Sequence, residues 1–163
     1  MIRQLKKCIF KILYVLILIY LSIFVPVFWG YKPLVIISGS MEPVLKVGGI
    51  LYYKENDLSS FKENDILVYK LNKHIISHRI VNITNTGFIT KGDNNLSLDT
   101  YEVNGSQVIG KGTDWSIPYI GYYADFIYNH KYLLFMSLSA IIIDLLAGFY
   151  GDRKERISNE KDY

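Results

Sequence analysis

The chain has 163 residues, half of them hydrophobic, with a formal net charge of +3 and a single cysteine. One cysteine excludes an internal disulfide and leaves no thiol cluster for a metal site. Residues 31–131 carry equal numbers of acidic and basic side chains, so this part lacks the basic stripe that nucleic-acid binding requires. Glycine-rich phosphate loops are also absent from the sequence, and we expect neither a nucleic-acid partner nor a cofactor.

Residues 1–11 contain only basic charged side chains, and residues 12–29 contain no charged side chain at all. An apolar helix of this length can cross the hydrocarbon core of a bilayer, which is about 30 Å thick. A cleaved signal peptide has the same order of charges, but this apolar run is long for one and no Ala-x-Ala-like cleavage site follows it. We therefore predict a cytoplasmic N-terminus at 1–11 and a transmembrane signal anchor at 12–30, with the next residues on the outer side.

A short apolar run at residues 34–37 leads into the sequence SGSMEP at residues 38–43. Gly39 would allow backbone dihedrals that a Cβ forbids, and Pro43 fixes the exit of the turn. Ser40 could then be held with its hydroxyl exposed and its amide free to donate, which is the local geometry that a serine nucleophile needs. Glycine and serine are also ordinary turn formers, so this segment alone leaves a plain turn open.

Beyond this turn, short alternating or β-branched runs are separated by turn residues. We predict strands at residues 50–53, 66–71, 75–83, 88–90 and 107–109. The turn at 85–87 closes a hairpin, and the sequence KGDNN at 91–95 forms a loop. Residues 31–131 should therefore form a small, mostly β domain with enough core to fold.

Aromatic side chains concentrate at residues 115–126. Such a segment suits the lipid interface, where aromatic rings collect, and it equally suits an ordinary aromatic core. Residues 132–150 then contain one charged side chain, Asp144, and basic residues follow this run. We predict a second transmembrane helix at 132–150 and a cytoplasmic tail at 151–163. The predicted fold is a mostly β catalytic domain flanked by two transmembrane helices.

Two residues of these apolar segments have more than one interpretation. Asp144 is costly in hydrocarbon and would normally indicate a functional role. Because it lies near the end of the apolar run, it could instead sit near the headgroups or face a partner helix. Cys8 lies at the cytoplasmic entry of the predicted anchor, where a thiol could be palmitoylated or could be an inert buried side chain.

A serine nucleophile needs a general base, and the base needs an orienting group. His78 is the best candidate base, because histidine exchanges protons near neutral pH and a strand would hold its ring rigidly. His74 lies four residues earlier, on the same face of a regular strand, so spacing alone does not choose between them. Asp93 and Asp99 follow in one loop, where either could orient an imidazole or simply form a turn.

Several sequence blocks occur in a suggestive order. They are SGSMEP at 38–43, SHRI at 77–80, KGDNN at 91–95 with Asp99, and a closing segment with IGK at 109–111 and IPYIG at 117–121. This order resembles type I signal peptidase of the endoplasmic-reticulum and archaeal kind, which also occurs in spore-forming Gram-positive bacteria. The resemblance covers roughly residues 34–123. It implies a mostly β catalytic domain outside the membrane that cleaves signal peptides from exported proteins.

The resemblance assigns roles residue by residue. Ser40 matches the nucleophile, and His78 matches the position where the usual bacterial signal peptidases have a lysine base. Asp99 matches the third catalytic residue, and Asp93 matches a supporting acid. Ser38 is placed like a hydroxyl that helps bind the oxyanion, together with the amide of Ser40. The resemblance further implies shallow pockets for small side chains one and three positions before the cut, with the substrate extended along a strand edge.

The function so implied is that of a serine endopeptidase of the Ser-His-Asp type, which acts by acyl transfer on the extracytoplasmic side of the cell membrane. The implied partners are signal peptides of secretory preproteins, the lipid bilayer and the protein translocation channel. Two alternatives stay open. One is a non-catalytic, membrane-anchored assembly subunit with the same fold, and the other is a Ser-Lys protease relative whose base would be Lys70 or Lys73.

Overall fold

The computed structural model describes residues 2–161, with side chains described from 4 to 150. Arg3 and the basic side chains of the predicted tail at 151–163 lie outside these described side chains. The chain divides into two compact units. One spans Tyr20–Asp125 and contains the sheet, and the other contains the residues before 20 and after 125.

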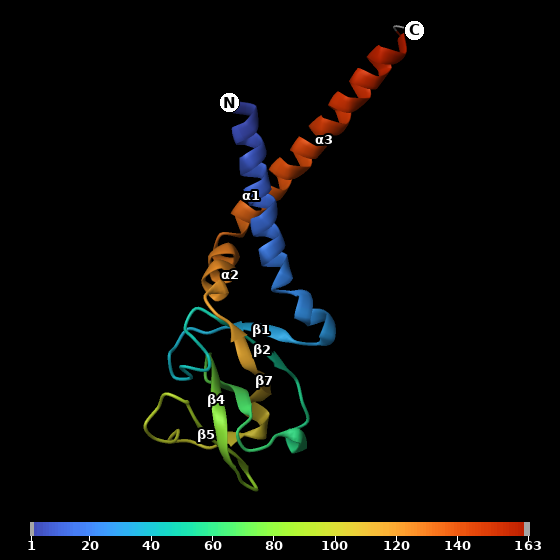
Figure 1. The fold of residues 1–163 in the computed structure, drawn as a ribbon. Helices are drawn as coiled ribbons and strands as arrows, with labels where there is room; N and C mark the ends of the chain where they lie inside the picture. The colour runs from blue at the N-terminus through green and yellow to red at the C-terminus, as the bar shows by residue number, and fades with distance from the viewer. Residues whose placement is uncertain (1, 162–163) are drawn as a thin grey trace. The chain divides into compact units, whose positions relative to one another are not determined.

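The helices are α1 (Ile2–Ser22), α2 (Ile120–Asn129) and α3 (Lys131–Lys161), and short 3-10 turns are η1 (Val25–Trp29), η2 (Leu58–Ser60) and η3 (Gly105–Gln107). The strands are β1 (Lys32–Val35), β2 (Ile50–Lys54), β3 (Ile66–Leu71), β4 (His74–Ile83), β5 (Gly87–Lys91), β6 (Val103–Asn104) and β7 (Val108–Ile117). They form one sheet in the order β1-β2-β7-β3-β4-β5-β6, and neighbouring strands are antiparallel (Figure 1). The predicted mostly β domain is therefore confirmed.

Strand β3 is buried on both of its faces. Successive side chains of a strand point to opposite sides, and those of β3 enter two different core clusters. Ile66 and Val68 pack into one core cluster with Met41. Leu67 and Tyr69 pack into a second cluster on the other face. The first cluster lies under the loop that holds Ser40, and the second includes Ile80 of β4. One central strand therefore supports both segments from which the candidate site is built.

Most predicted strands agree with the structure to within a residue or two, except on the C-terminal side. The strand predicted at 107–109 begins at Val108 and continues to Ile117 as β7. Glycines weaken a strand signal, and β7 contains Gly110 and Gly112. An added Cβ at Gly112 would lie 2.9 Å from Cγ2 of Ile66, so the glycine lets β7 pass close to β3. Strands β1 and β6 and helix α2 have no counterpart among the predicted elements.

The aromatic residues at 115–126 do not form one segment. Trp115 belongs to β7, Tyr119 lies in the connection with a φ of 63°, and Tyr122 belongs to α2. Their side chains are 54%, 62% and 59% exposed. The interpretation of these three residues as ordinary core is therefore wrong.

Two helical segments are long and apolar enough to cross a membrane by length and composition, Gln4–Trp29 and Lys131–Tyr150. They overlap the predicted spans at 12–30 and 132–150, although the first segment begins at Gln4 and not at residue 12. Within the unit that contains α1 and α3, Nζ of Lys6 lies 2.8 Å from Oδ1 of Asp144. Asp144 thus faces a helix of its own chain. Cys8 is exposed, so its interpretation as a buried thiol is wrong.

Candidate active site

Ser40 lies in the loop that follows β1. Met41 and Leu45 of this loop are buried in the core beneath it, and the Leu45 amide donates to the Met41 carbonyl at 2.9 Å. Gly39 lies outside the left-handed backbone region, and an added Cβ would meet Glu42 at 3.5 Å, an ordinary contact distance. The expectation that Gly39 is needed for unusual dihedrals is therefore wrong. The buried side chains, rather than the glycine, hold Ser40 in place.

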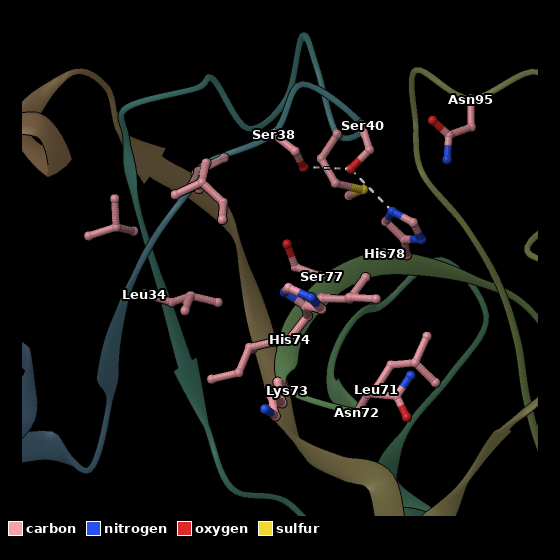
Figure 2. A pocket seen from close by; sticks show the side chains of 16 residues that line it. Leu34, Ser38, Ser40, Leu71, Asn72, Lys73, His74, Ser77, His78 and Asn95 are labelled. Carbon is pink, nitrogen blue, oxygen red and sulfur yellow. Dashed lines mark hydrogen bonds between the residues drawn. The ribbon is translucent and has the colours of Figure 1, made fainter.

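His78 is the histidine that reaches Ser40. It lies in β4 with 7% of its surface exposed, and its Nε2 is 3.1 Å from Oγ of Ser40 (Figure 2). His74 begins the same strand and lines one groove together with Ser40 and His78, but no described hydrogen bond joins it to Ser40. The geometry thus distinguishes two histidines that spacing alone could not separate.

Asp99 contacts the other nitrogen of this imidazole. Nδ1 of His78 and Oδ2 of Asp99 are 2.7 Å apart, and both side chains are only 9% exposed. Because an ionised carboxylate accepts hydrogen bonds and cannot donate them, we assign the proton to Nδ1, which leaves Nε2 to accept from the Ser40 hydroxyl. Ser40, His78 and Asp99 then form one continuous hydrogen-bonded chain, the arrangement that activates a serine in hydrolases of this type.

Further hydroxyl groups surround the Asp99 carboxylate. Thr90 Oγ1 donates to Asp99 Oδ2 at 2.6 Å, and Tyr69 Oη donates to the same oxygen at 3.3 Å. Tyr101 Oη lies 3.3 Å from Tyr69 Oη. Burial raises the pKa of the Tyr69 hydroxyl far above its ordinary value, so Tyr69 remains a donor. Sequence reasoning missed Thr90 and Tyr69, because they lie inside ordinary strand patterns that carry no motif.

Asp93 has a different partner from Asp99. Arg79 donates to both of its oxygens, from Nε at 2.8 Å and from Nη2 at 2.7 Å. A third donation, from Nη1 of Arg79 to the Asn64 carbonyl, measures 2.7 Å. The hydrogen bond to Asp93 raises the pKa of the Arg79 guanidinium. This two-pronged pair ties the loop after β5 to β4, immediately beside His78.

The loop after β5 also forms hydrogen bonds with the backbone around Ser40. The Asn94 amide donates to the Ser40 carbonyl at 2.8 Å, and the Asn94 side chain donates to the Gly39 carbonyl at 3.1 Å. Gly92 fits closely against this loop, because an added Cβ would lie 2.6 Å from the Ser40 carbonyl oxygen. The glycine that the site requires is therefore Gly92, and the reason is close backbone approach.

Ser40 and His78 lie at one end of a groove of about 660 Å³. Ser38 lies beside Ser40, with its Oγ 3.3 Å from the Ser40 Oγ (Figure 2). The walls are mainly apolar and come from the segments 34–37 and 71–76. Lys73 lines the end away from Ser40, and Lys70 is exposed on β3. No described hydrogen bond or ion pair joins either lysine to Ser40.

Two strand edges border this groove. β1 pairs with β2, and residues 74–78 of β4 pair with β3, whereas β5 pairs with β4 only from Arg79 onward. Within the described part of the chain, the outer edges of β1 and of residues 74–78 therefore have no strand partner. Open edges of this kind offer backbone donors and acceptors to an extended peptide.

The carboxylates of the site have separate partners, since Asp99 contacts His78 and Asp93 contacts Arg79. Among the residues that the structure describes, no group of three or more His, Cys, Asp or Glu side chains could hold a metal ion. The site contains a hydroxyl, an imidazole and a carboxylate in series, which suits nucleophilic attack and proton transfer.

Comparison with known proteins finds relatives that are named as signal peptidases or as catalytic subunits of a signal peptidase complex. The chain is 34% identical to signal peptidase I W of Bacillus subtilis over 99 residues, which cover 57% of this chain and 52% of that protein. It is 33% identical to the signal peptidase complex catalytic subunit sec11 of Neurospora crassa over 127 residues, which cover 68% of this chain and 73% of that protein. It is 32% identical to the Fusarium vanettenii protein of the same name over 118 residues, which cover 61% of this chain and 65% of that protein.

The matches differ in how much of each relative they cover. The chain spans about half of the Bacillus protein and about two thirds of the Fusarium protein. No family model matches the chain.

Proposed function

The chain belongs to the type I signal peptidases of the endoplasmic-reticulum and archaeal type, and we propose that it is a membrane-bound serine endopeptidase that cleaves signal peptides from exported preproteins. The observation that carries this proposal is the hydrogen-bonded chain from Ser40 through His78 to Asp99. It lies at the end of a groove whose two borders are open strand edges.

The reaction is acyl transfer. Ser40 Oγ attacks the scissile carbonyl while its proton passes to Nε2 of His78. His78 gives this proton to the leaving amine as the C–N bond breaks, and the N-terminal fragment remains as an ester on Ser40. His78 then takes a proton from water, and the resulting hydroxide attacks the ester. The C–O bond to Ser40 breaks, the N-terminal fragment leaves with a free carboxyl group, and His78 returns the proton to Ser40 Oγ. Asp99 orients the imidazole and stabilises its cation in both halves.

Negative charge develops on the carbonyl oxygen during each attack. The Ser38 hydroxyl, 3.3 Å from Oγ of Ser40, donates to this oxyanion together with the Ser40 amide. Removal of one such donor typically lowers kcat by about 10²–10³-fold. Ser38 therefore supports the reaction without exchanging a proton with the substrate.

The substrate lies extended in the groove and pairs with one or both of the open strand edges. Pairing fixes the backbone, so that alternate side chains point into the groove walls. The apolar part of the lining, which includes residues 34–37, Ile75 and Ile76, accepts uncharged side chains, and shallow pockets select small ones at the positions one and three residues before the cut. Signal peptides are the substrate class that meets both conditions.

The two apolar helical segments anchor the enzyme as a multi-pass protein of the cell membrane, with the sheet domain on the extracytoplasmic side. The basic residues before residue 12 favour a cytoplasmic N-terminus. Lys6 pairs with Asp144, which is consistent with Asp144 lying near the cytoplasmic end of its helix. Anchoring raises the effective concentration of a scissile bond that emerges from the bilayer beside the translocation channel.

The open alternatives fit these observations less well. A non-catalytic assembly subunit would not need the bonds that join Ser40, His78 and Asp99. A Ser-Lys enzyme would need Lys70 or Lys73 beside Ser40, and neither forms a described bond to it. The hydrogen bond between His78 and Ser40 therefore favours histidine as the base.

The test is cleavage of a preprotein by the full-length protein in lipid vesicles, with the new N-terminus identified by mass spectrometry. Ser40→Ala and His78→Ala should lower the cleavage rate by at least about 10³-fold. Lys70→Ala removes an exposed lysine outside the groove and should keep the wild-type rate. An inactive Lys73→Ala variant beside an active His78→Ala variant would instead identify a Ser-Lys enzyme.

A further inference from the structure

We propose that Thr90 is a positioning residue of the active site, which fixes the Asp99 carboxylate so that it can orient His78. This inference rests on the proposed function, because it gives Thr90 a role in the same proton-transfer chain. Thr90 belongs to none of the sequence blocks that carry the resemblance, and it touches neither Ser40 nor the groove. Its role follows from its contacts alone.

Thr90 holds Asp99 at two points. Its carbonyl accepts the Asp99 amide at 2.9 Å, and its Oγ1 lies 2.6 Å from Oδ2 of the Asp99 side chain. Thr90 itself is completely buried in β5, where it pairs with Ile80 of β4. Both the backbone and the carboxylate of Asp99 are therefore placed relative to the strand that carries His78.

The direction of the side-chain bond follows from proton counting. An ionised carboxylate has no proton, so the single hydroxyl proton of Thr90 must point to Asp99. The accepting oxygen, Oδ2, is also the one that accepts Nδ1 of His78 at 2.7 Å. Tyr69 donates to it as well, but from the longer distance of 3.3 Å. Thr90 is thus the shortest contact of the oxygen that holds the imidazole.

A buried threonine suits this role for two reasons. Its branched Cβ restricts rotation about χ1, so the hydroxyl stays aimed at Asp99 with little loss of entropy. A hydrogen bond to a charged acceptor in a low-dielectric site is also stronger than one in water. Without the hydroxyl, Oδ2 would keep only one short donor, and the carboxylate could rotate away from His78.

The experiment compares variants of the full-length enzyme that differ by one hydroxyl. Thr90→Val keeps the shape of threonine and removes the hydroxyl, and Thr90→Ser keeps the hydroxyl. Turnover of a signal-peptide substrate is measured as kcat and KM separately, together with the melting temperature. We expect Thr90→Val to lower kcat by about 10–100-fold with KM nearly unchanged, and Thr90→Ser to stay within about threefold of wild type.

A matched control is Thr113→Val. Thr113 also uses its hydroxyl for internal bonds, at 3.1 Å to the Tyr52 carbonyl and 2.7 Å to the Trp115 carbonyl, but it has no contact with Asp99 or His78. Loss of the Thr113 hydroxyl should leave kcat unchanged. If Thr90→Val does not fold, Thr90→Ala and Thr90→Ser make the same comparison, because they too differ only by the hydroxyl.

The outcomes separate this inference from the proposed function. Wild-type enzyme that cleaves no signal peptide contradicts the proposed function itself. Active wild-type enzyme with normal kcat in Thr90→Val overturns only the role of Thr90. Equal losses of kcat in Thr90→Val and Thr90→Ser would also overturn it, because a variant that keeps the hydroxyl would then be as impaired as one that lacks it, and the loss would reflect the packing of this buried position.

Discussion

Asp93 and Asp99 lie in one loop, but their carboxylates have different partners. Asp99 accepts from His78 and Thr90, whereas Asp93 accepts two bonds from Arg79. We expect Asp99→Asn to lower kcat by about 10³–10⁴-fold, because the imidazole loses its orienting anion. The melting temperature should change little, because the amide has nearly the same shape as the carboxylate.

Compared with Asp99→Asn, the Asp93→Asn variant should lose more stability and less turnover. It weakens a two-pronged ion pair that is partly exposed, and we expect it to lower the free energy of unfolding by about 1–2 kcal/mol. Turnover should fall less than in Asp99→Asn. Melting curves and single-turnover rates of both purified variants make the comparison. A folded, inactive Asp93→Asn beside a fully active Asp99→Asn would reverse the two roles.

Tyr69 should make the fold sensitive to alkaline pH. Burial raises its pKa above the ordinary value of 10.0, so the folded chain keeps a proton that the unfolded chain loses above that pH. The unfolded state then binds fewer protons, and the free energy of unfolding falls as the pH rises. The contribution of Tyr69 is about 1.4 kcal/mol per pH unit above about pH 10.

Tyr69→Phe removes this one contribution. The measurement is the free energy of unfolding by denaturant at several pH values between about 9 and 11.5. We expect a shallower decline in the variant than in wild type, whatever the stability of the variant at pH 8. Parallel declines in the two proteins would show that Tyr69 ionises as freely in the fold as in the unfolded chain.

At the residue scale, the sequence predicts some members of the site and not others. Ser40 and His78 are predicted from the order of the sequence blocks that carry the resemblance, because the motif around Ser40 alone could be a plain turn and spacing alone does not separate His78 from His74. The partners of Asp93 and Asp99 depend on how β5 pairs with β4, which spacing along the chain does not reveal. Thr90 is missed altogether, because a threonine in a strand is ordinary and only the fold places its hydroxyl against a carboxylate.

At the scale of elements, the predicted strands succeed where burial produces a clear pattern. Strand β3 begins with a continuous apolar run at residues 66–69, where both of its faces are buried, and its bounds of Ile66–Leu71 are those predicted. Strand β6 has only two residues, too few for any pattern. Strand β1 contains Pro33, which demotes a strand signal, and β1 is indeed an edge strand as such a proline requires.

The loop between β5 and β6 should be sensitive at Gly92. An alanine there would place its Cβ 2.6 Å from the Ser40 carbonyl oxygen, so either the loop or the nucleophile must move. We expect Gly92→Ala to lower kcat by about 10²-fold, because small displacements of catalytic groups have effects of this size. Rates of preprotein cleavage at saturating substrate measure this loss.

Gly39→Ala is the matched comparison for Gly92→Ala. Gly39 is adjacent to Ser40, but an added Cβ would have only ordinary contacts, at 3.5 Å or more. We expect a much smaller loss of kcat than for Gly92→Ala. The reverse order of the two effects would show that the nucleophile loop depends on the dihedrals of Gly39 rather than on the fit of Gly92.

At the scale of the whole molecule, two apolar helical segments flank the sheet domain in the sequence. A two-span arrangement places both termini in the cytoplasm and the domain outside. Protease added to intact cells should therefore spare a tag at the C-terminus and should cut a site inserted in the exposed loop at Leu96. Digestion of the C-terminal tag in intact cells would contradict the second span.

In the proposed mechanism, Ser40 is acylated by its substrate with His78 as the base. The most direct measurement is a rapid acid quench of the full-length enzyme during turnover, followed by peptide mass mapping. We expect an adduct with the mass of the cleaved N-terminal fragment on the peptide that contains Ser40. We also expect this adduct to form at least about 10³-fold more slowly in His78→Ala. An adduct on another residue, or one that forms at the wild-type rate in His78→Ala, would contradict this mechanism.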